Sequence, residues 1–226
     1  MPAEYMTAFI ITAILGAAAF VLWSKLRQHQ RADYIRSFDW PAGLLAQFES
    51  HYAGFSRKES ALTGNGLRQF FLAYLLSGQK YVAMPSQAAD TLWHEFILYT
   101  RDYHSFCARA FGGFLHHTPA VVLRPQHKRS NEGLRRVWWQ ACKSENIDPV
   151  HPTRLPLLFA LDVKLGVPNG YIYQPDCSAL RRDGAAGGQC GGDFSSSSYD
   201  GGTDGFGDAG SGDGGDGDGG GCGGGD

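Results

Sequence analysis

The sequence lacks the residue spacings that define the common small metal, redox and nucleotide-binding motifs. No C-x-x-C pair occurs, which excludes a thioredoxin-like redox motif and a zinc ribbon at the level of sequence. There is also no Ser-centred nucleophile elbow, no P-loop and no dinucleotide-binding glycine pattern. An odd number of cysteines prevents complete disulfide pairing: Cys107, Cys142, Cys177, Cys190 and Cys222.

Lysine and arginine are absent from the end of the chain, Asp183 to Asp226, which consists mainly of Gly, Asp and Ser. We expect residues 183–226 to be a disordered tail, because they cannot bury enough apolar surface to offset their ordering entropy. Clustered Asp on flexible glycine could bind calcium, but the nonapeptide repeat of such sites is missing, which favours a solvated linker. The tail carries nine Asp, so the overall charge of −2 leaves +7 on the remaining residues. Neither charge block by itself indicates a nucleic-acid partner, and we expect none.

Uncharged residues run from Tyr5 to Ser24. As a helix rising about 1.5 Å per residue, this segment would cross the roughly 30 Å hydrocarbon layer of a bilayer. A cleaved signal peptide and a buried core helix are the alternatives. The signal peptide is disfavoured because Glu4, and no Lys or Arg, precedes the apolar run. The sequence therefore predicts a transmembrane anchor over residues 1–27.

Basic residues follow this span closely: Lys25, Arg27, Arg31 and Arg36. Because Lys and Arg are retained on the cytoplasmic side, we expect a single-pass inner or plasma membrane protein with its N-terminus outside. The body would then lie in the cytoplasm. In that reducing compartment the cysteines should be free thiols or metal ligands.

Residues 28–182 form the predicted body, whose roughly 155 residues suffice for one hydrophobic core. Helical periodicity is clearest in one apolar stripe: Leu67, Phe70, Phe71, Tyr74 and Leu75. Further helices are predicted after Ser86, over 103–111 before Gly112, over 134–142, and from Pro156 to Gly166. Short extended pieces at 81–84, 120–123 and 171–173 are too few for a sheet that would define the fold. We expect an all-α, multi-helix body.

Metal-capable side chains gather between Asp90 and His117. Asp90 and His94 are four residues apart, so they share one helix face. Cys107 lies on the inward stripe of the next predicted helix, and His116 and His117 follow where that helix ends. If the two helices fold onto each other, His94, Cys107 and one or both of the later histidines can bind one ion, with Asp90 as a further ligand or as an orienting partner of His94.

Zinc is the expected occupant, since imidazole and thiolate suit it better than they suit Mg²⁺ or Ca²⁺. The alternative is a polar core network without metal, because Cys107 is also a typical small core residue. Glu95 beside His94 does not make an H-E-x-x-H zinc-protease helix, since position 98 is Leu. His104 points off the inward stripe and should be exposed.

The run W-H-E-F-I-L-Y-T-x-x-Y-x-x-F-C followed by F-G-G-F-x-H-H-x-P resembles the bacterial branch of the glycine-rich domain-containing protein family. Plant members of that family carry a similar Asp-x-x-Trp-His motif. The downstream LPLLFALD and the Gly-rich end extend the resemblance over most of the chain after about Asp39. The resemblance implies no substrate. It implies these motif positions: Asp90, Trp93, His94, Cys107, His116 and His117.

Two classes of function remain open from the sequence. The first, which we favour, is a membrane-tethered binding or scaffold domain, stabilised by a metal, that holds a protein partner. The second is a metal-dependent hydrolase at the membrane surface, in which three ligands leave a position for an activated water and Glu95 or Asp90 acts as base. A closed four-ligand site would favour the scaffold, and three ligands facing a cleft would favour the enzyme.

Overall fold

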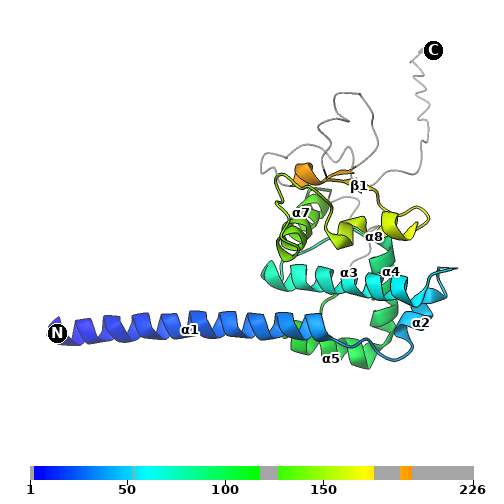
Figure 1. Ribbon diagram of the computed structural model, residues 1–226. Helices are drawn as coiled ribbons and strands as arrows, with labels where there is room; N and C mark the ends of the chain where they lie inside the picture. The colour runs from blue at the N-terminus through cyan, green and yellow to red at the C-terminus, as the bar shows by residue number, and fades with distance from the viewer. Residues whose placement is uncertain (1–2, 53, 118–126, 176–188, 195–226) are drawn as a thin grey trace, which may run out of the picture.

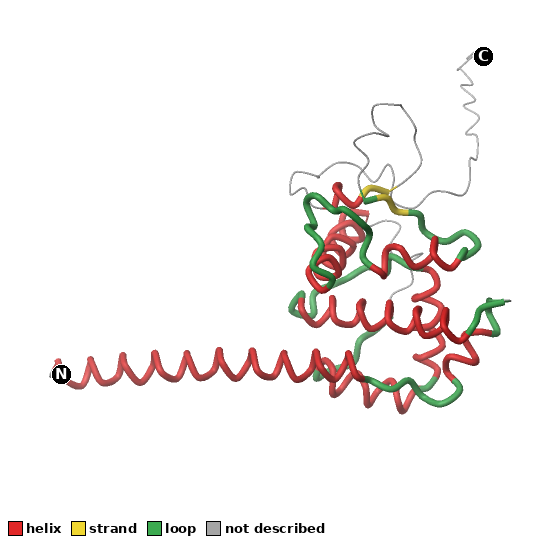
Figure 2. Tube along the Cα trace, in the orientation of Figure 1, coloured by secondary structure: helices red, strands yellow, loops and turns green. Residues whose placement is uncertain are grey.

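The computed structural model describes residues 3–52, 54–117, 127–175 and 189–194. Helices dominate these ranges, as the sequence predicted, and the strands form one short parallel pair (Figure 2). The elements are α1 (Ala3–Ser37), α2 (Leu44–Glu49), α3 (Arg57–Leu76), α4 (Gln87–Leu98), α5 (Thr100–Phe111), α7 (His127–Ser144), α8 (Leu157–Leu165), β1 (Tyr173–Gln174), β2 (Gln189–Cys190) and the 3-10 helix η2 (Gly191–Phe194).

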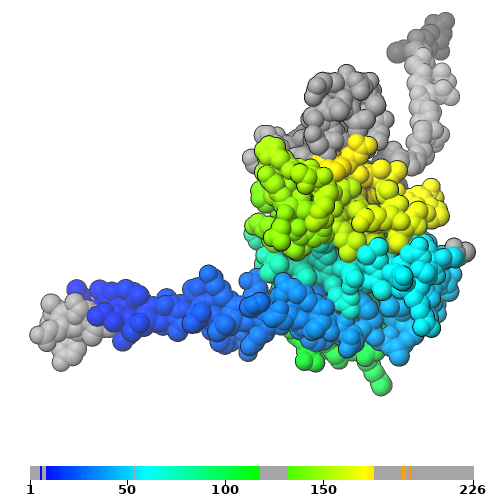
Figure 3. Space-filling model, in the orientation of Figure 1, coloured from blue at the N-terminus to red at the C-terminus, as the bar shows by residue number. Residues whose placement is uncertain are grey.

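Helix α1 has two parts with different surroundings. Its apolar part stands clear of the body as an uncovered rod, and none of its most apolar 18-residue window is buried (Figures 1 and 3). The helix is long and apolar enough to span a membrane. Its last turns belong to the body, because Ala32 and Ile35 are buried there and the Tyr34 ring lies 5.9 Å from that of Phe106.

Helix α3 lies at the centre of the body, with α1 and α5 on one side and α7 and α8 on the other (Figure 1). It begins at a capping box, in which Ser56 N donates to Glu59 Oε2 over 2.5 Å and Glu59 N donates to Ser56 Oγ. The predicted apolar stripe faces the core, where Leu67, Phe70 and Phe71 are buried.

Helices α4 and α5 form a pair joined by Tyr99 alone. Ser86 caps α4 as predicted, accepting from Ala89 N at 3.1 Å. Helix α5 ends at Gly112, whose φ of +79° is the left-handed conformation that favours glycine. A single connecting residue forces the pair to turn sharply, so the residues after α5 return toward α4.

Residues 189–194 pack against the body, although the sequence predicted disorder from Asp183 onward. Phe194 is buried, with its ring centroid 5.5 Å from that of Trp138 and 5.7 Å from that of Phe159. This short piece holds an aromatic ring and a cysteine, and these supply the apolar contact that the flanking Gly and Asp cannot. The rest of the predicted tail lies outside the described residues.

Two further expectations need correction or placement, and one helix was not expected. Cys190 is disulfide-bonded, so the expectation of free thiols or metal ligands is wrong for it. Residues 81–84 form no strand, residues 120–123 lie outside the described ranges, and β1 begins at Tyr173. Helix α2 was not predicted, because six residues are too few for a helical period to stand out.

Candidate metal centre

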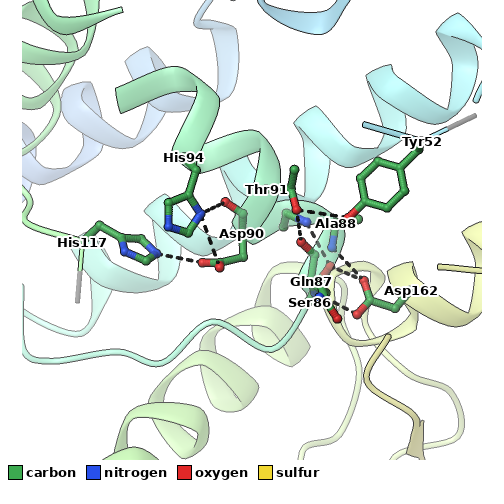
Figure 4. A network of polar contacts seen from close by, with 10 residues as sticks. Tyr52, Ser86, Gln87, Ala88, Asp90, Thr91, His94, His117 and Asp162 are labelled. Atoms are coloured by element: carbon green, nitrogen blue, oxygen red, sulfur yellow. Dashed lines mark hydrogen bonds and ion pairs between the residues drawn. The ribbon is translucent and has the colours of Figure 1, made fainter. Parts of the chain in front are cut away.

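Asp90, His94 and His117 come together beside α4. One ligand atom from each lies within 4.8 Å of the other two. His117 Nε2 is 2.8 Å from Asp90 Oδ1, and His94 Nδ1 is 3.4 Å from Asp90 Oδ2. Figure 4 shows the two imidazoles approaching the same carboxylate, and their ring centroids are 4.1 Å apart. The structure therefore brings together three of the five residues that the sequence indicated.

The Asp90 and His94 pair follows from helix geometry, since residues four apart lie one above the other on α4. His94 Nδ1 also lies 2.8 Å from the Asp90 carbonyl oxygen, which holds the ring against its own helix. Side-chain exposure is 35% for Asp90, 49% for His94 and 11% for His117. The cluster is thus closed on the His117 side and open to solvent at His94.

His117 is positioned by a chain of hydrogen bonds that starts in the core. Trp93 Nε1 donates to Tyr103 Oη over 3.1 Å, and Tyr103 Oη donates to the Leu115 carbonyl over 2.5 Å. This fixes the backbone two residues before His117. The Trp93 ring also meets the His117 ring edge-on, with centroids 4.5 Å apart. The imidazole is therefore held by packing as well as by Asp90.

Asp162 fixes the start of α4 and with it the position of Asp90. Its carboxylate is buried at the end of α8 and accepts from Ser86 Oγ at 2.6 Å (Figure 4). It also accepts from three backbone N–H groups, those of Gln87, Ala88 and Tyr171, at 2.8, 3.2 and 2.9 Å. A negative charge is favoured at a helix N-terminus, where the N–H groups have no intrahelical partners. Sequence reasoning missed this role, because the two segments are 76 residues apart.

Cys107 lies in the core and is not part of the cluster. Its side chain is fully buried on the inward face of α5, and burial raises the pKa of its thiol, although hydrogen bonds with Leu115 and Tyr103 act in the other direction. Zinc ligation requires the thiolate, so a thiol held protonated here is poorly suited to it. The inward stripe that made Cys107 look like a ligand turned it toward the aromatic core instead.

His116 also lies outside the cluster. It is exposed, and its ring packs on Phe114 with centroids 4.8 Å apart. Of the two adjacent histidines, His117 contacts Asp90 and His116 contacts Phe114. His104 is exposed on α5, as predicted.

Glu95, one of the two expected bases, points toward α2. Its Oε1 lies 2.7 Å from His51 Nε2, and Thr91 one turn earlier lies 3.0 Å from Tyr52 Oη. This face of α4 is therefore occupied by contacts with the residues after α2. The sequence offered no signal for the His51 contact, which joins residues 44 apart.

Two imidazole nitrogens and one carboxylate oxygen form a donor set that suits zinc. The same residues can also stand as a metal-free His-Asp-His group, in which His117 Nε2 hydrogen-bonds the Asp90 carboxylate and His94 Nδ1 hydrogen-bonds the Asp90 carbonyl oxygen. Two surface hollows in the described part of the chain lie elsewhere, one lined by Thr100, Arg101, His104 and Ser105, the other between α3 and the start of α8. The cluster lies at the surface, outside both hollows.

Comparison with known proteins identifies the family but no activity. A family model described as UCP032817-like, an uncharacterised family, matches residues 30–194, which includes the ordered segment after Gln189. The expected membership of the glycine-rich domain-containing family is therefore wrong, since the match carries no indication of that family. The motif residues that suggested it are largely helix-packing and cluster positions. No curated protein and no solved structure is significantly similar to the chain.

Proposed function

We propose that this chain, which belongs to the UCP032817-like family, is a membrane-anchored helical binding domain with a zinc centre at Asp90, His94 and His117. The observation that carries the proposal is the convergence of these three side chains within 4.8 Å. Two supports favour a built site. Asp162 fixes the helix that carries two ligands, and Trp93 and Tyr103 fix the third.

Zinc fits this donor set better than the alternatives. Mg²⁺ and Ca²⁺ prefer shells of oxygen ligands, whereas two imidazoles and a carboxylate are common around zinc. Binding would replace the two contacts from the imidazoles to Asp90 with three bonds to the ion. If the three residues form a hydrogen-bonded group without metal, these bonds do not form and added zinc does not stabilise the protein.

The anchor of this domain is the apolar part of α1, which we propose crosses the bilayer over Tyr5 to Ser24. We place the body in the cytoplasm, because the basic residues that follow the span determine which end of the helix stays in the cytoplasm during insertion. The disulfide at Cys190 is more typical of an oxidising compartment. The redox state of Cys190 in cells is therefore a second test of the orientation. A reporter fused after Asp226 should be active only in the cytoplasm, and extracytoplasmic activity would reverse the assignment.

Metal-dependent hydrolysis is the second candidate function. The cluster has three protein ligands, one of which, His94, is exposed, so a coordination position is left for water. Binding is favoured over it by the fate of the two expected bases. Glu95 is paired with His51, and Asp90 would be a ligand. Zinc-dependent cleavage of an activated model ester by the wild type, but not by His117→Ala, would instead support the enzyme.

The direct test is zinc stoichiometry of the full-length protein in detergent, stripped with chelator and then titrated. We expect one bound equivalent for the wild type. His94→Ala, His117→Ala and Asp90→Asn should each weaken zinc binding by at least about 100-fold, since each removes a ligand. His116→Ala is the matched control, because it removes an exposed imidazole from the adjacent position and should leave binding unchanged. Wild-type protein that holds well under one equivalent would rule out the metal centre.

A further inference from the structure

Helix α1 is continuous from its apolar part into the body, so the body stands at a set height above any bilayer that the helix crosses. Trp23 lies at the end of the predicted span, and the Arg27 guanidinium carbon lies 4.5 Å from the centroid of its ring. Trp is typical of the membrane interface. Arg31 follows Trp23 by eight residues, or about 12 Å along the helix.

The C-terminal end of α5 lies at the level of Arg31. Helices α1 and α5 are in contact (Figure 1). A Cβ atom on Gly112 would lie 2.5 Å from Arg31 Nη2. Arg109, one turn earlier on α5, places its guanidinium carbon 4.5 Å from the centroid of the Tyr34 ring on α1. The end of α5 is therefore one part of the body that lies beside the emerging span.

The end of α3 lies at the same level. Gln79 Nε2, just past that end, donates to the Phe111 carbonyl over 2.9 Å. Two helix C-termini thus meet here, and their carbonyl ends carry partial negative charge that an anionic surface would repel. Basic residues accompany both ends: Arg31 lies against Gly112, Arg109 lies one turn before the end of α5, and Lys80 follows Gln79 in the chain. Asp33, the acidic residue of this part of α1, pairs with Arg36 at 2.8 Å.

We infer that Arg27, Arg31 and Arg109 form a headgroup-binding surface that seats the body on anionic phospholipid in the bilayer crossed by α1. Arg27 and Arg109 are exposed and Arg31 is half-buried, and a guanidinium can bind a phosphate through two parallel N–H groups. The polar layer of a bilayer is roughly 5 to 8 Å deep, so Arg31 lies within about one Debye length of it. The inference rests on the anchor in the proposed function and is independent of the metal centre.

The test uses the full-length protein in lipid nanodiscs, either of phosphatidylcholine alone or with about one third phosphatidylglycerol. Amide exchange over the end of α5 and the following loop should slow by about threefold to tenfold in the anionic discs, because bound headgroups restrain this end of the body. High salt, about 0.5 M, should remove most of the difference. Soluble glycerol phosphate should not reproduce it in neutral discs.

Two variants remove the surface in different ways. Arg31→Gln with Arg109→Gln should abolish the lipid-dependent protection. Arg27→Gln, which leaves the contact between α1 and α5 intact, should reduce it by at least half. The matched control is Arg57→Gln with Lys58→Gln, which removes the same charge from the exposed opposite end of α3 and should retain full protection.

Equal exchange in the two lipids for the wild type would overturn the inference, as would equal loss in the Arg57 and Lys58 control. Failure of the protein to enter discs of either composition would overturn the anchor itself. Zinc stoichiometry is measured separately in detergent, so failure of the metal centre remains distinguishable from both.

Discussion

Two aspartates, Asp162 and Asp90, lie at helix α4 and differ in how many hydrogen-bond donors the protein provides to their carboxylates. Asp162 is buried, and four protein donors surround its carboxylate. Asp90 is part-exposed, and within the described part of the chain its side chain pairs with the imidazoles of His94 and His117. Both carboxylates lie near the first turn of the same helix, yet one is saturated by the fold and the other faces ionisable rings at the surface.

The difference separates a structural carboxylate from a candidate ligand. Neutral N–H and O–H donors from the backbone and Ser86 leave Asp162 no room for an ion. The partners of Asp90 are themselves metal ligands once they release or turn away their protons. The comparison therefore predicts that Asp162 contributes to folding whatever the solution contains, and that Asp90 contributes mainly when zinc is present.

The largest effect should come from Asp162→Ala. It leaves buried N–H and O–H groups at the start of α4 without an acceptor, so we expect the free energy of unfolding to fall by about 3 to 5 kcal/mol. Denaturant titration of the full-length protein in detergent measures this. Asp90→Ala with chelator present is the control and should cost under about 1 kcal/mol, because its contacts are part-exposed. Similar losses in the two variants would remove the distinction between the carboxylates.

Zinc should produce the next largest effect. At a free zinc concentration of 100 times the dissociation constant, the wild type should gain about 2.7 kcal/mol of unfolding free energy, since the unfolded chain does not hold the ligands together. His117→Ala and Asp90→Ala should lose this gain, as read from melting curves with zinc and with chelator.

Melting curves of Cys107→Ser with zinc and with chelator test whether Cys107 is a ligand. Burying a hydroxyl in place of the thiol should cost about 1 to 3 kcal/mol, and the cost should be the same with zinc or chelator. A loss of the zinc gain in this variant would return Cys107 to the ligand set.

The smallest effect concerns a third carboxylate, Glu145, which is intermediate between the two aspartates in exposure. Burial raises its pKa, but Leu157 N at 2.5 Å, Gln69 Nε2 at 2.9 Å and Arg154 outweigh burial and leave the pKa below its usual value. A lowered folded-state pKa stabilises the protein above the unfolded pKa, and this stabilisation is lost as the pH falls.

Glu145→Gln should therefore reduce the acid sensitivity of the fold. Between about pH 5 and about pH 3, the unfolding free energy of the wild type should fall by about 1 kcal/mol more than that of the variant. Parallel denaturant titrations across this range provide the measurement. Identical slopes for the two proteins would show that Glu145 is not held ionised by the fold.

Local signals predicted most of the helices. The stripe from Leu67 to Leu75, the cap at Ser86 and the stop at Gly112 each depend on neighbours within one or two turns, and each stands as expected. The pairing of Asp90 with His94 has the same origin, because a helix places residues four apart on one face. A single aromatic residue among Gly, Asp and Ser forms no such local pattern, although Phe194 is buried. Phe194 was therefore assigned to the tail.

Contacts between distant segments decided the rest of the site. Periodicity places Cys107 on an inward face, but whether that face meets a metal or an aromatic core depends on what packs opposite it. Likewise, the sequence does not distinguish His116 from His117, because both are histidines at the same short distance after the predicted helix. The hydrogen bond from Tyr103 to the Leu115 carbonyl sets the backbone that turns one toward Asp90 and leaves the other exposed.

The sequence by itself determined the apolar N-terminal helix, the all-helical body and the pairing of Asp90 with His94, because each follows from the order of residues within a few helical turns. The tertiary structure alone decided that His117 completes the cluster, that Cys107 is core, and that Asp162 caps α4 from 76 residues away. The physical reason is that a carboxylate is satisfied by whichever donors the packed chain brings to it. Packing, unlike periodicity, is a property of the whole fold.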